Sequence, residues 1–221
     1  AQGVQVRFIR NNLSNNITIT DKYFRDMEAA GIQIKRYTHI CYGLRNYIMR
    51  INHQQHRKIL VIDGEVAYTG GMNLNDNYFY RWRDTHLRLT GGVVASLQCA
   101  FFDTWLTAGG RLSHPLPSYF RLDEQKRPNH ETCFVPHDGC DDESQTNIRL
   151  TQVVPDDPTY PEPLQLTAYE WVLHHAKHYV WFQSPYLAPP QSLIDAMRSA
   201  VERGVEVKVM IPEWCIRQAQ V

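Results

Sequence analysis

Residues 56–73 read HRKILVIDGEVAYTGGMN, and this stretch carries most of what the sequence predicts about fold and chemistry. His56 and Lys58 are separated by one residue, so on an extended strand both side chains point to the same face. The segments ILVID, GE and VAYTGG are typical of a strand, a turn and a second strand. We expect this hairpin to return Asn73 to the neighbourhood of His56 and Lys58.

An imidazole, an ammonium and an amide in one small site suit the transfer of a phosphoryl group. One group attacks or protonates, while the others hold the charged oxygens. The sequence has no glycine-rich loop of the nucleotide-binding type ahead of a predicted helix, so ATP-dependent transfer is not expected. A solvated pair on a strand edge explains His-x-Lys alone, but not its spacing to Gly70, Gly71 and Asn73.

The spacing resembles the signature of the phospholipase D superfamily, H-x-K-x(4)-D-x(6)-G-[SG]-x-N. Every place in it is filled, by the following residues: His56, Lys58, Asp63, Gly70, Gly71 and Asn73. Three segments are most similar to the bacterial cardiolipin synthase branch: NHQQHRKILVIDGEVAYTGGMN (52–73), WRDTHLRLTG (82–91) and QSPYLAPPQSLIDAMRSAVERGVEVKVMIP (183–212). The resemblance implies an α/β fold, an αβα sandwich of two similar lobes, with one His-x-Lys motif from each lobe per active site.

The resemblance also implies roles for particular residues. We expect His56, Lys58 and Asn73 to be catalytic, with Asp84 hydrogen-bonded to the motif histidine, since an acid is common in this superfamily near that spacing. The structural supports of the motif would be Asp63, Gly70 and Gly71, where Asp63 suits a turn whose carboxylate accepts backbone N–H groups. Arg50 and Arg57 are candidate phosphate-binding residues, because residues 44–58 are basic and lack carboxylates. Solvated arginines would explain that charge equally well.

An internal repeat indicates why only one motif is present. GVQVRFI begins at Gly3 and GVEVKVMI begins at Gly204. The distance from Gly3 to His56, measured from Gly204, runs past Val221. We therefore expect the back of one lobe in residues 1–110, a linker or insertion in 111–147, and the front of a second lobe in 148–221. The second His-Lys motif would come from a missing segment or a partner chain, and the 221 residues alone would be inactive.

Composition fits part of a globular enzyme. The 221 residues are 43% hydrophobic, and 23 basic side chains balance 23 acidic ones, so no global field favours nucleic acid. The sequence contains neither an 18-residue apolar run nor a signal peptide. The five scattered cysteines fit a reducing compartment better than a disulfide framework. By resemblance we expect association with the cytoplasmic side of a bacterial membrane.

Hydrophobic periodicity predicts alternating strands and helices. Strands are expected at 3–9, 32–37, 58–63, 66–70, 85–91, 147–154, 178–183 and 204–211, and helices at 21–31, 93–108, 164–177 and 190–203.

Two clusters lie outside this pattern. The aromatic segment NYFYRW (77–82) is expected to pack in the core, and a lip at which lipid enters is the alternative. His130, Cys133, His137 and Cys140 have zinc-competent side chains, but their tight middle spacer and the acidic residues around them favour a solvated loop. We therefore expect no metal and no cofactor.

The predicted function is transfer of a phosphatidyl group between alcohols through a phosphohistidine, as in cardiolipin synthases, with phosphatidylglycerol the expected substrate at a membrane surface. A phospholipase D, a phosphodiesterase or a nuclease of the same superfamily is the alternative within enzymes, and net neutrality argues against nucleic acid. An inactive lobe that serves as a binding or pairing module is the alternative from another class.

Overall fold

The computed structural model describes residues 3–11, 21–37, 55–112, 151–156 and 162–212. The chain divides into two compact units, Ala1–Val153 and Val154–Val221. This division falls later than the boundary expected at residue 148, because Val153 packs against the core of the first unit. Both units combine helices with strands, so the mixed α/β class that the sequence predicts is confirmed.

The first unit opens with a parallel strand pair. Strand β1 (Arg7–Asn11) pairs with β2 (Gln33–Tyr37), and helix α2 (Asp21–Ala29) connects them. Phe24 of α2 is buried, and its ring lies 3.9 Å from the Arg10 guanidinium carbon. Gly31 ends the helix with a φ of 92°, and its N–H donates to the Glu28 carbonyl, as expected for a glycine at this position.

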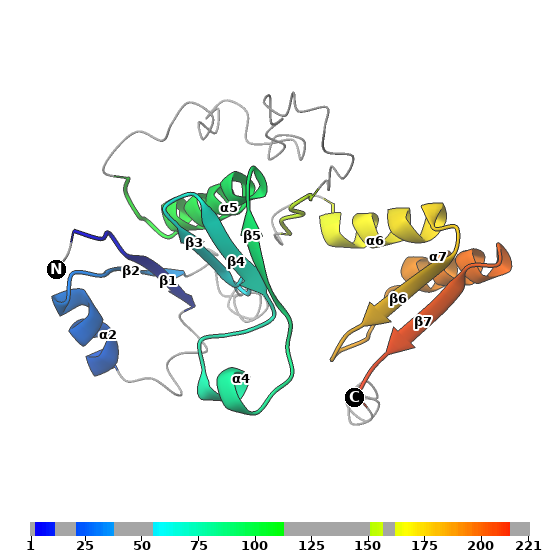
Figure 1. Ribbon diagram of the computed structural model, residues 1–221, viewed down its shortest axis with the longest axis horizontal. Coiled ribbons are helices and arrows are strands. Elements are labelled where there is room, and N and C mark those ends of the chain that lie inside the picture. Colours follow the sequence, from blue (N-terminus) through cyan, green and yellow to red (C-terminus); the bar gives the residue numbers. More distant parts are fainter. Residues whose placement is uncertain (1–2, 12–20, 38–54, 113–150, 157–161, 213–221) are drawn as a thin grey trace, which may run out of the picture. The chain divides into compact units, whose positions relative to one another are not determined.

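The motif hairpin is confirmed and belongs to a three-stranded antiparallel sheet. Strand β3 (Ile59–Ile62) pairs with β4 (Val66–Gly70), which pairs on its other edge with β5 (His86–Thr90). Helix α5 (Val93–Thr107) packs on this sheet (Figure 1). The core between them is formed by the following buried residues: Ala67, Val94 and Leu97, with Ile59, Val61 and Leu89 packed around them.

The long connection between β4 and β5 contains a short helix that the sequence did not predict, α4 (Asp76–Tyr80). Asn75 caps its N-terminus by accepting a hydrogen bond from the Asn77 N–H. None of the residues of α4 is buried, and Phe79, Tyr80 and Trp82 are exposed. The expectation that the NYFYRW aromatics pack in the core is therefore wrong for Phe79, Tyr80 and Trp82, because the connection extends beyond the ends of β4 and β5 (Figure 1).

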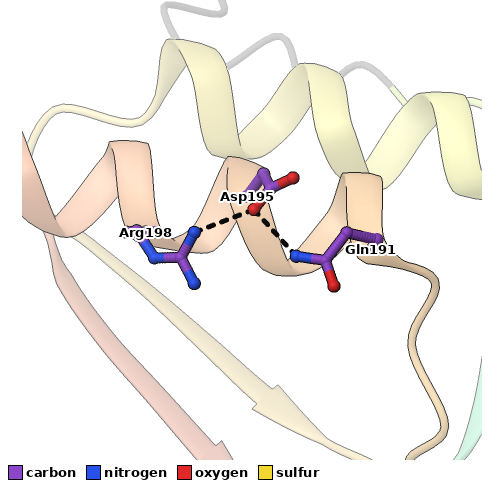
Figure 2. Close-up of polar contacts among 3 residues, drawn as sticks. All are labelled: Gln191, Asp195 and Arg198. Carbon is purple, nitrogen blue, oxygen red and sulfur yellow. Dashed lines mark hydrogen bonds and ion pairs between the residues drawn. The ribbon is translucent and has the colours of Figure 1, made fainter.

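The second unit packs two helices on a parallel strand pair. It runs through α6 (Leu164–His175), β6 (Tyr179–Gln183), α7 (Gln191–Glu202) and β7 (Glu206–Met210). Its core consists of the following buried residues: Leu173, Val180, Leu193, Ala196, Ala200 and Val205. On the exposed face of α7, one carboxylate oxygen of Asp195 accepts hydrogen bonds from Gln191 and Arg198, both at 2.9 Å (Figure 2).

Two expected strands differ from the observed ones. The first strand begins at Arg7 and not at Gly3, and residues 151–156 form no strand, in contrast to the strand expected at 147–154. The repeat is visible in the backbone all the same, since Gly3 and Gly204 both have positive φ, 79° and 87°. Each of them precedes one strand of a parallel pair.

Candidate active site

Residues 55–58 lead directly into β3 and place the His-x-Lys pair at its start. The Lys58 ammonium donates a hydrogen bond of 2.7 Å to the backbone carbonyl of His56. Lys58 is half-buried, whereas His56 is exposed. The Lys58 side chain thus folds back toward the residue two positions earlier. Its ammonium charge therefore lies close to His56.

Burial lowers the pKa of Lys58 to about 8, and the negative charge of Asp84 acts in the opposite direction by raising it. The structure therefore brings Asp84 and Lys58 into electrostatic contact. At neutral pH such a lysine is still mostly protonated. A partly desolvated ammonium is a stronger partner for a phosphoryl oxygen than a fully hydrated one.

The pKa of the His56 imidazole is lowered from its usual value, first by desolvation from neighbouring protein atoms and second by the positive charge of Lys58. A lowered pKa increases the fraction of neutral imidazole at pH 7. Neutral imidazole is the form that can attack phosphorus. Desolvation and the charge of Lys58 thus both lower the His56 pKa in the direction that a nucleophilic histidine needs.

Arg57 contacts a different part of the unit. Its guanidinium donates to the Thr104 hydroxyl of α5 at 3.4 Å, and the Gln55 amide donates to the same hydroxyl at 3.1 Å. Gln55 also accepts a hydrogen bond from the Arg57 backbone N–H. These contacts fasten the motif segment to α5, and the phosphate contact expected for Arg57 stays a prediction.

Gly70 and Gly71 lie close to two other residues, His86 of β5 and Asp84, which precedes that strand. A Cβ atom on Gly71 would be 2.6 Å from Oδ2 of Asp84, and a Cβ on Gly70 would be 2.9 Å from Nδ1 of His86. Gly70 is paired with His86 in the sheet, so the close approach is set by strand register. Glycine is required here because any side chain would displace Asp84 or push the strands apart.

Asn73 is held by the α4 connection. Its side-chain amide donates a 2.8 Å hydrogen bond to the hydroxyl of Tyr78, which is one partner that orients the amide. The Tyr78 ring in turn meets the Trp82 ring edge-to-face at 4.9 Å between centroids. Asn73 is therefore attached to the aromatic segment that follows the motif.

The two predicted carboxylates have different surroundings. Asp84 accepts a 2.7 Å hydrogen bond from the Thr85 N–H, and within the described residues no hydrogen bond joins it to His56. Its pairing with the histidine therefore stays a prediction.

Asp63 lies in the hairpin turn with a φ of 54°, followed by Gly64 at 74°, and the Glu65 N–H donates to the Ile62 carbonyl. Positive φ at both central residues is what a type I′ turn requires.

Other candidates lie outside the described residues, namely Arg50 and the cluster His130, Cys133, His137 and Cys140. Of the five cysteines, the structure describes Cys99, which is buried in α5. In the described part of the chain, no three His, Cys, Asp or Glu side chains are grouped as metal ligands.

Sequence reasoning missed Tyr78 and His86. His86 Nδ1 is buried and has no hydrogen-bond partner within the described residues, although it lies beside the motif glycine Gly70. Its position two residues after Asp84 was the available signal, since alternate residues of a strand share a face. The contact of Tyr78 with Asn73 could not be predicted, because it depends on helix α4, which the sequence did not predict.

Comparison with known proteins agrees with this site. The family model described as "Cardiolipin synthase, PLD-like domain" matches residues 1–105 and 171–220. The chain therefore belongs to the phospholipase D-like family of cardiolipin synthase domains, as the motif predicted. The matched residues include the whole His-x-Lys hairpin and the β5 segment.

Relatives are similar over nearly the whole chain. The Major cardiolipin synthase ClsA of Bacillus subtilis is 31% identical over 96% of the chain and 40% of its own length. The Cardiolipin synthase of Clostridium perfringens is 31% identical over 96% of the chain and 42% of its own length, and Cardiolipin synthase A of Pseudomonas fluorescens is 29% identical over 96% and 40%. The chain thus spans about 40% of the length of these relatives.

Proposed function

We propose that this chain contributes one active-site half to a phosphatidyltransferase of the cardiolipin synthase type. The observation that carries the proposal is the His56 and Lys58 pair at the start of β3, with the His56 pKa lowered and Asp84 acting on Lys58, in a chain of the cardiolipin synthase family. The similar proteins that share this family bear the name cardiolipin synthase.

In the proposed reaction, a neutral histidine attacks the phosphorus of a phosphatidylglycerol. A P–N bond forms, the P–O bond to the headgroup glycerol breaks, and the leaving alkoxide takes a proton from a second histidine. The second histidine then accepts the proton of an incoming alcohol, whose oxygen attacks the phosphorus, so that a P–O bond forms, the P–N bond breaks and the first histidine is released. The acceptor is the headgroup hydroxyl of another phosphatidylglycerol, so the products are cardiolipin and glycerol. Which of the two histidines attacks is left open, and either role requires His56.

Lys58 and Asn73 would stabilise the phosphoryl oxygens as negative charge develops on them. Asp84 would keep Lys58 protonated through its charge, in addition to the pairing with His56 that the motif predicts. These groups supply the positive charge and the donors that the step requires, so the proposal assigns no metal or cofactor.

We propose further that the active enzyme is an αβα sandwich of two lobes and that the second histidine belongs to the other lobe. The repeat supports this, because Gly3 and Gly204 both have positive φ and each precedes one strand of a parallel pair. The second His-Lys motif would come from a further segment or a partner chain. A purified monomer of these 221 residues is then expected to show no sustained turnover.

The site is proposed to act at the surface of a bacterial membrane, on its cytoplasmic side. Among the helices that the structure describes, none is both long and apolar enough to cross a bilayer.

The test is product analysis with phosphatidylglycerol vesicles and a polypeptide that carries both motifs. Equimolar cardiolipin and free glycerol are expected, and single-stranded DNA in the same reaction should stay intact. Phosphatidic acid as the main product would show a phospholipase D, and DNA cleavage would show a nuclease. No product at all from the two-motif polypeptide would favour a binding module.

A further inference from the structure

The α4 connection exposes a group of large apolar side chains beside the motif. Leu74, Phe79, Tyr80 and Trp82, which we call the aromatic surface, are 79%, 52%, 82% and 58% exposed. Single exposed apolar residues are normal, but four within nine residues of chain are not, and such clusters mark interaction sites. Helix α4 lies in the connection beyond the ends of β4 and β5 (Figure 1), and none of these side chains belongs to the core between the sheet and α5.

The residue types and the local charge indicate what covers this surface. Tyrosine and tryptophan prefer the boundary between hydrocarbon and water, because each has an apolar ring and a polar group. Arg81 and Arg83 flank Trp82 and are both exposed, and the exposed carboxylates of Asp76 and Asp84 lie at the two ends of the same segment. Arginines next to aromatic side chains favour anionic phospholipid headgroups over a neutral protein surface.

The aromatic surface is also attached to the candidate active site. Tyr78 accepts the hydrogen bond of Asn73 and contacts the Trp82 ring, so the motif and the surface share one short segment. A phospholipid keeps its phosphate at the headgroup level of the bilayer. A site that reacts with that phosphate has to reach the same level, and α4 is positioned to bring it there.

From these observations we infer that the aromatic surface docks the first unit on an anionic phospholipid bilayer, with Phe79, Tyr80 and Trp82 in the interface and Arg81 and Arg83 at the headgroups. The inference deepens the proposed function and rests on it for the identity of the lipid. It assigns membrane contact to a surface of the motif-bearing unit itself.

The test is the binding of the 221-residue chain to vesicles of phosphatidylglycerol and phosphatidylcholine, measured by co-sedimentation. The triple variant Phe79→Ser, Tyr80→Ser, Trp82→Ser should bind at least about tenfold more weakly, since three aromatic rings lose their burial. Tyr78 is kept, so that its bond to Asn73 is preserved. Arg81→Ala and Arg83→Ala should each weaken binding about fivefold, and only when phosphatidylglycerol is present.

A matched control lies in the second unit, where Trp171, Trp181 and Tyr186 are 61%, 62% and 76% exposed. Their triple serine variant removes the same kind of surface and should bind as the unchanged chain does. Circular dichroism melts should be similar for both triple variants. Equal loss of binding in both, no loss in the α4 variant, or no binding of the chain to these vesicles would overturn the inference.

A second protein molecule could cover this surface in place of lipid. Sedimentation velocity distinguishes the two cases, because it measures whether the chain forms a dimer. A dimer of the 221-residue chain that the α4 variant dissociates would assign the surface to a second copy and overturn the inference. The proposed function is tested separately with a two-motif polypeptide on monomeric short-chain phosphatidylglycerol. There the double variant Phe79→Ser, Tyr80→Ser, which leaves Trp82 and Tyr78 in place, should keep its turnover while losing turnover on vesicles. Failure of the proposed function would abolish both reactions in the unchanged protein as well.

Discussion

The carboxylate of Asp84 lies directly over Gly71, where a Cβ atom would be 2.6 Å from Oδ2. The same carboxylate raises the pKa of Lys58. Gly71 therefore leaves the space that the Asp84 carboxylate needs in order to act on Lys58.

Gly71→Ala should displace Asp84 without unfolding the unit, because the obstructing atoms belong to an exposed side chain that can rotate away. The melting temperature should change little. The pKa of Lys58 should fall below about 8, since the stabilising negative charge moves away from the ammonium. NMR titration of the Lys58 side chain measures this, and an unchanged Lys58 pKa would show that Asp84 does not depend on Gly71.

Gly70→Ala should instead destabilise the sheet. A Cβ on Gly70 would meet the backbone of Thr85 and His86, and backbone cannot rotate away as a side chain can. We expect a loss of about 1–3 kcal/mol in the free energy of unfolding, the usual cost of forced overpacking. Gly91→Ala is the control, because Gly91 has a positive φ of 81° but open space around it. Urea unfolding that gives the same loss for both variants would contradict the close approach.

The activity of a two-motif enzyme should decline above about pH 8. Lys58 has a pKa of about 8, so above that pH it loses the proton with which it binds phosphoryl oxygens. Asp84→Asn should move this decline to lower pH, because loss of the carboxylate lowers the Lys58 pKa further. The measurement is kcat/KM against pH. A rate that stays level to pH 10, near the usual lysine pKa, would exclude Lys58 as the titrating group.

Lys58→Ala and Asn73→Ala should each lower kcat by about 10²-fold or more, the size expected when one donor to developing charge is removed. Tyr78→Phe should lower kcat less, because it only releases the Asn73 amide from its 2.8 Å partner. Lys22→Ala is a suitable control, since Lys22 is exposed on α2 and pairs with Asp26. Equal rates for the Asn73 and Lys22 variants would remove Asn73 from the site.

The sequence predicted the hairpin well because its signals are local. Asp63 and Gly64 suit the turn, and the apolar residues on each side suit strands, so the structure follows the prediction there. Helix α5 was predicted for the same reason, from the hydrophobic periodicity of residues 93–108.

What the sequence could not show depends on contacts between distant segments. The proximity of Gly70 to His86 requires the β4–β5 register, and the Arg57 contact with Thr104 requires the packing of α5. The NYFYRW aromatics were predicted to be buried because large apolar side chains usually are. Their exposure follows from a connection that leaves the sheet, which residue types alone do not reveal.

If His56 is a reacting group, its loss should stop cardiolipin formation without unfolding the protein. Cardiolipin formation from phosphatidylglycerol should be compared between a two-motif polypeptide and its His56→Ala variant, with melting temperatures recorded for both. Because His56 is exposed and packs in no core, the variant should melt normally and form no detectable cardiolipin. A folded His56→Ala variant that makes cardiolipin at a near-normal rate would contradict the account.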